Sequence, residues 1–413
     1  MRMTTNAWRS VLAVLGGALL SSITNGSVWA QQNEVKVGLI APISGPWARQ
    51  GELMLKGAQL AVDDINAQGG IKALGGAKLK LVTFDTGDSV EKAKNAAQRM
   101  VSEEPDLVAA TGSFLSSFTL AVTEVTERAE LPFLTFSYSD LLTSRGFKYI
   151  FKTSPTGSEL AESALPTILK VAQQATGKKP ASVGIVMDNT ASPVSFSKPM
   201  REGGAEKLGL KITVDETYTP PLSDATTLIQ RVRSARPDIL LMLATSVPDD
   251  KLILEKLTEF GLGARRIPVV GNGTHLGVPE LATTVDHSIL EGVMSIVSNW
   301  GAKGQEKIIN EFKQRTGQPW MTEDSMSSYG DMWIFKEALE AAGAVDRKKV
   351  AQAIRQMDRT DGPALYYPGR RVKFDDKGLR VGAELLIYQW QNGVPVTVYP
   401  PDSAVAVIRW PKG

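Results

Sequence analysis

The chain has no cysteine and only two histidines, His275 and His287. Without a thiol, neither a disulfide nor a lipid-modified cysteine is available, and a chain of 413 residues buries enough apolar surface to be stable without disulfides. A metal centre built from three or four His and Cys ligands is excluded as well, although a carboxylate site is not. These absences remove disulfide-stapled scaffolds and His/Cys metalloproteins from consideration.

Catalytic and nucleotide-binding motifs are also missing. The sequence has no Gly-x-Ser-x-Gly elbow, which leaves a hydrolase triad without an obvious nucleophile, and it has no P-loop lysine. Gly271-Asn272-Gly273 with Gly277 follows an apolar run and superficially suggests a dinucleotide loop, but its third glycine comes one residue late. We therefore expect no enzymatic activity, no cofactor and no metal.

Neither charge nor hydrophobicity is concentrated in one long block. The 46 basic and 44 acidic residues nearly cancel, and no long run of Lys or Arg stands out. A nucleic-acid-binding protein normally shows a basic face or stripe, so we expect no nucleic-acid partner. The length suggests two domains, because single hydrophobic cores stop growing at roughly 250–300 residues.

The first thirty residues have the layout of a secretory signal peptide. Arg2 and Arg9 supply positive charge, Val11–Leu20 is a short apolar run, and Val28-Trp29-Ala30 places small residues around a cleavage point. The apolar run is too short for a membrane span, which needs roughly 20 residues. No apolar stretch of spanning length follows it. We predict export, cleavage after Ala30 and a soluble mature chain.

After this leader the chain alternates short apolar runs with segments of helical periodicity. Alternation of this kind predicts parallel strands with helices on both faces, because a parallel crossover needs a connection long enough to hold a helix. The segments expected in the first part are strands at Val35–Ile40, Leu79–Phe84, Leu107–Thr111 and Leu131–Thr135, and helices at Leu53–Ile65, Val90–Val101 and Ser116–Ala129.

The same alternation restarts after residue 180, which indicates two similar lobes rather than one large sheet. The end of the chain differs, with three helices followed by two apolar runs around Gln391-Asn392-Gly393, and Asn-Gly predicts a tight hairpin turn. The expected strands are Val183–Met187, Ile212–Val214, Ile239–Leu243, Val269–Val270, Glu384–Trp390 and Val394–Tyr399, and the expected helices are Ser195–Leu208, Ala225–Ser234, Asp249–Phe260, Gln305–Arg315, Ser327–Ala342 and Lys348–Met357.

Small polar loops follow several of the expected strands. In open α/β sheets, ligands bind beyond the carboxyl ends of the strands, where Gly112-Ser113 and Ser137–Ser139 are expected. Ser116 and Ser117 begin a helix there, and the free N–H groups of a helix N-terminus suit a carboxylate. Ser116 alone is equally well explained as a helix cap. Two serine-bearing loops on neighbouring strands favour binding.

Several short sequence motifs occur in a fixed order along the chain. They are Val37-Gly38-Leu39 leading to Ser44-Gly45-Pro46, Gly57-Ala58 with Ala61–Asn66, Gly69-Gly70-Ile71, Phe84-Asp85-Thr86, Leu131-Pro132-Phe133, Ser144–Phe147 and Phe374–Gly378. In identity and spacing these motifs resemble those of the leucine/isoleucine/valine-binding proteins of ABC importers, which are type I periplasmic binding proteins, and the similarity is strongest before residue 155.

The resemblance implies a fold and a mechanism. It implies two Rossmann-like lobes with parallel central sheets, joined by a hinge of three crossings that closes on the ligand. The first lobe would hold residues 31–152 and 296–365, and the second would hold residues 153–295 and 366–413. Closure would create the form that an ABC permease in the inner membrane recognises. Proteins of this sort usually act as periplasmic monomers.

The resemblance also implies ligand contacts on the first lobe. The family's carboxylate-binding serine aligns with Ser116, beside Ser117. The next loop, which binds the carboxylate and amino ends, aligns with Ser137 and Ser139, and Tyr138 stands between them. An aromatic wall residue of the family aligns near Gln50, where the nearby ring is that of Trp47. We expect these side chains to contact a ligand.

On the second lobe the chain departs from the family pattern. Ser246 stands where the family has a tyrosine, and Gly273 stands where it has the acidic residue that pairs with the ligand ammonium. A buried ammonium without such a partner would lose several kcal/mol of compensation. Either Asp188 or another acidic residue takes over the pairing, or the ligand has no ammonium. Aromatic rings, among them those of Phe114 and Phe196, are candidates for stacking on an apolar ligand body.

The ligand expected from these features is a small carboxylate-bearing compound. It is either a hydrophobic or branched-chain amino acid, or an aromatic or aliphatic acid. The leading function is the substrate-binding component of an importer. A periplasmic receptor that reports ligand binding to a chemoreceptor or sensor kinase would share the fold, and the sequence does not separate the two.

Overall fold

A five-stranded sheet lies in the first part of the chain. The computed structural model describes residues 34–263 and 266–410, so the predicted cleavage site after Ala30 falls outside the described residues. All neighbouring strands of this sheet are parallel, in the order β2-β1-β3-β4-β5. The strands are β1 (Glu34–Ala41), β2 (Lys78–Asp85), β3 (Ala109–Gly112), β4 (Phe133–Thr135) and β5 (Ile150–Lys152).

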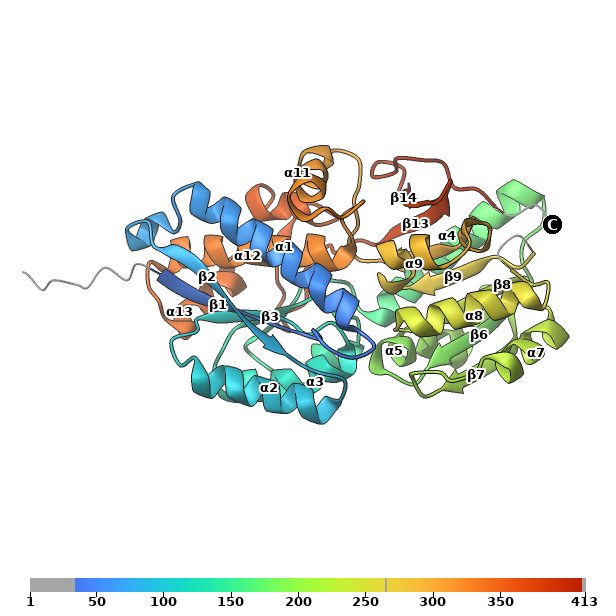
Figure 1. Cartoon of the computed structure of the whole chain (residues 1–413), viewed down its shortest axis with the longest axis horizontal. Coiled ribbons are helices and arrows are strands. Elements are labelled where there is room, and N and C mark those ends of the chain that lie inside the picture. Colours follow the sequence, from blue (N-terminus) through green and yellow to red (C-terminus); the bar gives the residue numbers. More distant parts are fainter. Residues whose placement is uncertain (1–33, 264–265, 411–413) are drawn as a thin grey trace, which may run out of the picture. The chain divides into compact units, whose positions relative to one another are not determined.

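Helices cover both faces of this sheet, as the alternation predicted (Figure 1). One face packs under helices that include α1 and α12, and the other packs under α2 and α3. In β1, Leu39 points into the first core and Ile40 into the second, which is why the strand is an almost unbroken apolar run. The helices are α1 (Ala48–Ala67), α2 (Val90–Glu103), α3 (Ser116–Arg128), α11 (Glu306–Thr316), α12 (Glu323–Ala342) and α13 (Arg347–Gln356).

A second sheet of seven strands has the order β14-β13-β10-β9-β8-β6-β7. Five of its strands are parallel, and the last two pair antiparallel as the predicted hairpin, with Asn392 and Gly393 at positive φ in the turn. The strands are β6 (Ser182–Asp188), β7 (Lys211–Tyr218), β8 (Ile239–Leu243), β9 (Val269–Asn272), β10 (Met294–Val297), β13 (Leu386–Gln391) and β14 (Val394–Tyr399).

The helices around the second sheet also form two packed layers. One hydrophobic core contains residues of α4 and α5, and the other contains residues of α7 and α8. The α4 helix begins with a complete capping box between Thr156 and Glu159. The helices are α4 (Gly157–Thr176), α5 (Ala191–Pro199), α6 (Ala205–Lys207), α7 (Thr226–Ala235), α8 (Val247–Glu259), α9 (Pro279–Thr284) and α10 (His287–Leu290).

Two expected helices differ from the structure. The helix expected over 195–208 is interrupted after α5 by the wider turn η3 (Met200–Gly204). Glu202 and Gly203 leave helical geometry there, because the Gly203-Gly204 pair has a low helix propensity. The α12 helix begins at Glu323, four residues before the expected Ser327. This earlier start matters because it places the first residue of α12 in the candidate site.

The chain crosses between the two sheets three times, after β5, after β10 and before β13. We name the five-stranded sheet with its helices lobe 1 and the seven-stranded sheet with its helices lobe 2. The boundaries at residues 152, 295 and 365 stay a proposal. Tyr367, Val372 and Phe374 pack in the core of lobe 1, which favours a last crossing after residue 374. The short elements are η1 (Lys72–Leu74), η2 (Asp140–Leu142), η4 (His275–Gly277), η5 (Gly362–Tyr366), β11 (Asp358–Arg359) and β12 (Val372–Lys373).

Within the described residues, none of the helices combines the length and the apolar character that crossing a membrane would require.

Candidate ligand-binding site

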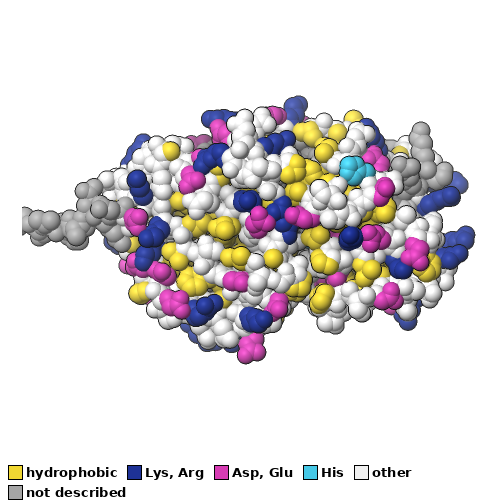
Figure 2. All heavy atoms as spheres, viewed as in Figure 1, with side chains coloured by type: hydrophobic (Ala, Val, Ile, Leu, Met, Phe, Trp, Pro, Cys, Tyr) yellow, Lys and Arg dark blue, Asp and Glu magenta, His cyan; other side chains and the backbone are white. Residues whose placement is uncertain are grey.

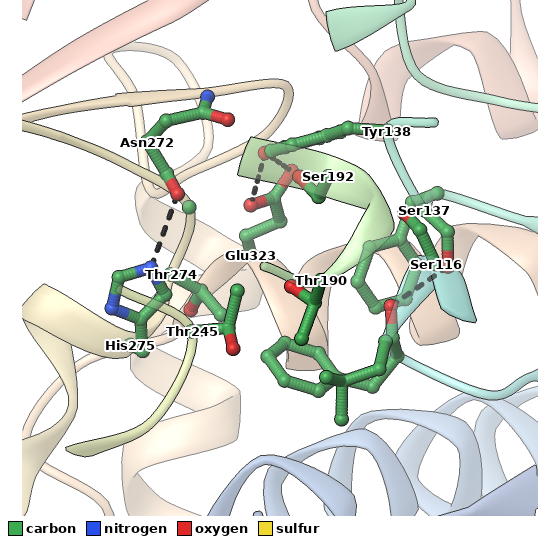
Figure 3. Close-up of a pocket in the computed structure, with 14 residues that line it drawn as sticks. Ser116, Ser137, Tyr138, Thr190, Ser192, Thr245, Asn272, Thr274, His275 and Glu323 are labelled. Atoms are coloured by element: carbon green, nitrogen blue, oxygen red, sulfur yellow. Dashed lines mark hydrogen bonds between the residues drawn. The ribbon is translucent and has the colours of Figure 1, made fainter. Parts of the chain in front are cut away.

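A cavity with an empty volume of about 410 Å³ lies where the carboxyl ends of the strands in both lobes meet. Figure 3 shows that side chains from several separate segments of the chain converge there. Lobe 1 contributes Phe114, Leu115, Ser116, Phe136, Ser137, Tyr138 and Glu323, and lobe 2 contributes Thr190, Ser192, Thr245, Asn272, Gly273, Thr274 and His275.

Ser116 is the first residue of α3 and is 2% exposed. Its Oγ accepts a hydrogen bond from the backbone N–H of Ser139 at 3.0 Å, and among the described residues no acceptor takes its own proton. The hydroxyl is therefore a donor toward the cavity. The first turn of α3 contains no acidic residue, so its partial positive charge is not neutralised locally. This part of the wall suits an anion.

Ser137 lies on the loop after β4 and is also buried. Its Oγ donates to the backbone carbonyl of Phe114 at 2.7 Å and accepts from the hydroxyl of Thr135 at 3.1 Å. The Thr119 hydroxyl lies 2.7 Å from the same Oγ, so the hydrogen-bonding capacity of Ser137 is used within lobe 1 and its role is to hold the cavity wall. The bond to Phe114 holds the loop before α3 against the loop after β4.

Glu323 and Tyr138 are hydrogen-bonded to each other in the cavity wall (Figure 3). The Tyr138 hydroxyl lies 2.7 Å from both carboxylate oxygens, and the Ser298 backbone N–H donates to Oε1 at 3.0 Å. The Ser298 hydroxyl also donates to Oε1. Burial raises the pKa of Glu323 from 4.5 to about 7, against these hydrogen bonds, which lower it. Since Ser298 follows β10, this buried network also fastens the second crossing to lobe 1.

The raised pKa of Glu323 predicts a pH-dependent contribution to stability. The folded chain retains a proton between pH 4.5 and about 7 that the unfolded chain releases, so this contribution is complete below pH 4.5 and is lost as the pH rises through 7. We expect the wild type to lose stability relative to Glu323→Gln across this window, by at most about 1.4 kcal/mol per pH unit. Urea unfolding of both proteins at pH 5, 6, 7 and 8 measures the difference.

The exposed Glu162, changed to Gln, is the control and should give a difference that does not vary with pH. A constant difference for Glu323→Gln over the same range would contradict a raised pKa at this position.

On the lobe 2 side, three threonine hydroxyls donate away from the cavity to buried carboxylates. Thr190 and Thr245 donate to Asp188, each at 2.6 Å, and Thr274 donates to Asp324 at 3.0 Å. Asp188 and Asp324 do not line the cavity themselves. The wall therefore carries hydroxyls whose protons are already used, with carboxyl groups behind them.

His275 completes this wall. Its Nδ1 lies 2.5 Å from Oδ2 of the buried Asp250, and its Nε2 lies 3.1 Å from the backbone carbonyl of Asn272. Burial lowers the pKa of the His275 imidazole, but the Asp250 carboxylate outweighs it, so the net pKa is raised. The imidazole is thereby paired within lobe 2. Over residues 34–263 and 266–410, no group of three or more His, Asp and Glu side chains is arranged to bind a metal ion.

Five of the residues named from the sequence line this cavity, namely Phe114, Ser116, Ser137, Tyr138 and Gly273. Gly273 has a φ of 120°, and a Cβ added there would approach the His275 ring to 3.0 Å, so the absent side chain makes room for that ring. The acidic residue that the family places at this position has no direct replacement in lobe 2. Glu323 of lobe 1 is the carboxyl group that reaches the cavity.

The other predicted contacts lie outside the cavity lining, and the serines among them bond to other parts of the chain. The buried side-chain amide of Gln50 has no hydrogen-bond partner among the described residues. Ser117 accepts from the Ala191 N–H at 3.1 Å, which joins α3 to α5 across the lobes. Ser139 accepts from Leu141 N–H and from the Ser195 hydroxyl, and Ser246 caps α8 through Asp249 N–H. Trp47 packs edge-on against Phe118, Gln50 is buried in α1, and Phe196 is a core residue of lobe 2.

Glu323, His275 and the threonines were not singled out by the sequence reasoning as ligand contacts. Glu323 lies ahead of the helix start expected at Ser327 and so falls outside the elements that the sequence pattern predicts. His275 follows a strand end directly and is one of two histidines, a signal that could have indicated it. Thr190, Thr245 and Thr274 follow β6, β8 and β9, and the rule that ligands bind beyond strand ends applies equally to them.

Contacts between the lobes surround the cavity. Arg49 of α1 pairs with Glu280 of α9, with Nε and Oε1 2.6 Å apart, and Trp320 Nε1 donates to the Gly277 carbonyl at 2.7 Å. Figure 2 shows basic and acidic side chains together in the middle of this face. Tyr138, Glu323 and His275 are each less than 9% exposed, so a ligand bound there would be closed off from solvent. Entry then requires the lobes to separate.

Comparison with known proteins agrees with this architecture. Two similar proteins are Leu/Ile/Val-binding protein homolog 8 of Brucella melitensis, 28% identical over 97% of this chain and 98% of its own, and homolog 7 of the same organism, 27% identical over 98% of each. Among solved structures, a solute-binding protein of an ABC transporter from Rhodopseudomonas palustris in complex with benzoate has a TM-score of 0.76 at 16% identity, over 92% of this chain and 99% of that one.

A second solved structure, the branched-chain amino acid transporter substrate-binding protein of Streptococcus pneumoniae in complex with isoleucine, has a TM-score of 0.73 at 19% identity, over 88% of this chain and 99% of that one. The sequence model of the periplasmic binding protein family matches residues 34–394. The resemblance and the fold class inferred from the sequence are therefore confirmed. The chain belongs to the periplasmic binding protein family and has the type I fold of two lobes with parallel central sheets.

Proposed function

We propose that this protein captures a small carboxylate-bearing solute by hinge closure and delivers it to an ABC permease in the inner membrane. One observation carries the proposal. The Ser116 hydroxyl has an uncommitted proton, lies at the start of α3 and faces a closed cavity between the lobes. A carboxylate placed there would accept from this hydroxyl and face the positive end of the helix. In small-molecule sites, a few precisely placed polar groups fix the orientation of the ligand.

The apolar body of the ligand would rest on aromatic and aliphatic side chains of lobe 1. Phe114, Leu115 and Phe136 line the same cavity as Ser116. Because these side chains fit either an aliphatic or an aromatic body, two ligand classes stay open, a hydrophobic or branched-chain amino acid and an aromatic or aliphatic acid. The structural neighbours that hold isoleucine and benzoate support the inclusion of both classes.

We also propose that the protein acts as a periplasmic monomer, with the leader removed after Ala30. The intact mass of protein recovered from the periplasm tests this cleavage, because removal of residues 1–30 gives one defined mass.

The ligand class is tested by thermal shift with a panel of branched-chain and aromatic amino acids, aromatic acids, short fatty acids and sugars. We expect stabilisation by one of the carboxylate-bearing classes, since a ligand that binds only the folded form raises the melting temperature. Native mass spectrometry of the purified protein reports the mass of any retained solute. Stabilisation by a sugar and by no carboxylate would overturn the proposal.

A further inference from the structure

The carboxylate of Asp188 lies at the end of β6, behind the cavity wall of lobe 2. We propose that Asp188 is a positioning residue that determines ligand preference through Thr190 and Thr245, so that the site selects a solute with a hydrogen-bond donor, an ammonium or a hydroxyl, in addition to its carboxylate. This inference rests on the proposed function, because it takes the carboxylate end to be bound near Ser116.

The hydrogen bonds of Asp188 fix the direction of both threonine protons. Oδ1 accepts from the backbone N–H of Thr190 at 2.9 Å and from its hydroxyl at 2.6 Å, and Oδ2 accepts from the Thr245 hydroxyl at 2.6 Å. These O–H···O distances are those of charge-assisted bonds to an ionised carboxylate. Burial raises the net pKa of Asp188, and these three donors partly offset the effect of burial.

A hydroxyl has one proton and two lone pairs. With their protons directed to Asp188, Thr190 and Thr245 can only accept hydrogen bonds from a ligand. Both residues line the cavity, and Figure 3 shows them beside Thr274 and His275. Thr274 repeats the arrangement through its bond to Asp324. The three threonines of the lobe 2 wall therefore present acceptors to the cavity.

The charges around this wall favour the same kind of ligand group. None of the described residues that line the cavity is a Lys or Arg, and the one basic ring, that of His275, is already paired with Asp250. Carboxyl groups thus lie behind the threonines of lobe 2, whereas Ser116 and the start of α3 offer donors on lobe 1, which also brings the Glu323 carboxyl to the cavity. The threonines and Ser116 therefore have opposite hydrogen-bonding character.

Selectivity follows from the cost of burying unpaired polar groups. A ligand with a carboxylate and a plain hydrocarbon body would leave the threonine lone pairs buried without a donor. A site built to accept a hydrogen bond discriminates strongly against an analogue that lacks the donor. The missing acidic residue at position 273 is then compensated indirectly, with Asp188 acting through two hydroxyls.

Matched pairs of acids test this inference by calorimetric titration. The pairs are leucine with 4-methylpentanoate, and 4-hydroxybenzoate with benzoate; within each pair the members differ by a single donor group. For a pair that binds, we expect the donor-bearing member to bind the wild type at least about tenfold more tightly. Equal dissociation constants within the pair would overturn the inference, although carboxylate capture itself would stand.

Asp188→Asn separates positioning from folding. An asparagine amide donates to one of the two threonine hydroxyls, which releases that hydroxyl proton toward the cavity, so the ratio of dissociation constants within a pair should fall toward one. Thr245→Val, which keeps the side-chain shape and removes one acceptor, should lower the same ratio. The exposed Asp238, which bonds backbone and Ser182 far from the cavity, gives the control variant Asp238→Asn.

Each outcome of these titrations has one meaning. A reduced ratio in Thr245→Val and in folded Asp188→Asn, with an unchanged ratio in the control, supports the inference. An unchanged ratio in Thr245→Val overturns it, even where Asp188→Asn does not fold. If none of the four acids binds the wild type, this inference fails, while the proposed function is decided by the wider thermal-shift panel.

Discussion

Ser116→Asp should weaken the binding of any carboxylate-bearing ligand by at least about 100-fold. The new carboxylate would lie in a buried wall, next to the place proposed for the ligand carboxylate, and like charges in contact at a desolvated site cost several kcal/mol. Each 1.4 kcal/mol corresponds to about a tenfold change in the dissociation constant. Folding should be preserved, because an acidic side chain is favourable in the first turn of a helix. Calorimetric titration with the ligand found in the thermal-shift panel measures the loss.

Ser116→Asn is the matched control for charge. Asparagine has the size of aspartate and retains an acceptor for the Ser139 N–H, but it is neutral. We expect it to bind far more tightly than Ser116→Asp. If both variants lose affinity equally, size rather than charge is responsible, and the ligand carboxylate lies elsewhere in the cavity.

Gly57→Ala should lower the free energy of unfolding by at least about 2 kcal/mol, although the same change normally stabilises a helix by about 1 kcal/mol. Gly57 lies in α1 where α12 crosses it, and a Cβ there would overlap the backbone carbonyl of Ser325. A helix backbone cannot move aside alone, and Ser325 is further fixed by its hydroxyl bond to the Leu53 carbonyl at 2.8 Å. The cost of this steric overlap therefore exceeds the gain in helix propensity. Thermal and urea unfolding measure the effect.

Gln59→Ala, on the same helix, is the control because Gln59 is exposed. We expect its effect to stay within about 0.5 kcal/mol. A Gly57→Ala variant as stable as the wild type would show that α1 and α12 have room to separate at this crossing. Because α12 also carries Glu323, such looseness would argue against a rigid cavity wall.

The buried hydrogen bonds among Tyr138, Glu323 and Ser298 also connect the site to the hinge between the lobes. Tyr138 and Glu323 belong to lobe 1, and Ser298 follows the last parallel strand of lobe 2, yet all three share hydrogen bonds. A ligand that contacts Tyr138 or Glu323 therefore touches groups that hold the second crossing. Ligand binding and the relative position of the lobes are therefore coupled through these buried side chains.

The sequence determined the architecture because the relevant signals are local. Runs such as that of β1 predicted buried parallel strands, Asn392-Gly393 predicted the hairpin, and the alternation of elements predicted two sheets covered by helices. The rule for strand ends also indicated Ser116, Ser137 and Tyr138, since each of them follows a strand of lobe 1 closely.

Tertiary structure alone decided which polar groups share the cavity and how their protons are directed. Tyr138 meets Glu323 across 185 residues of sequence, and Thr245 meets Asp188 across 57. The same packing directs Ser139 and Ser246 to helix ends instead of the cavity. Periodicity reports which face of an element is buried, but not which distant element covers it. Hydrogen-bond direction depends on that covering element, so the character of the site emerges only when the lobes are packed together.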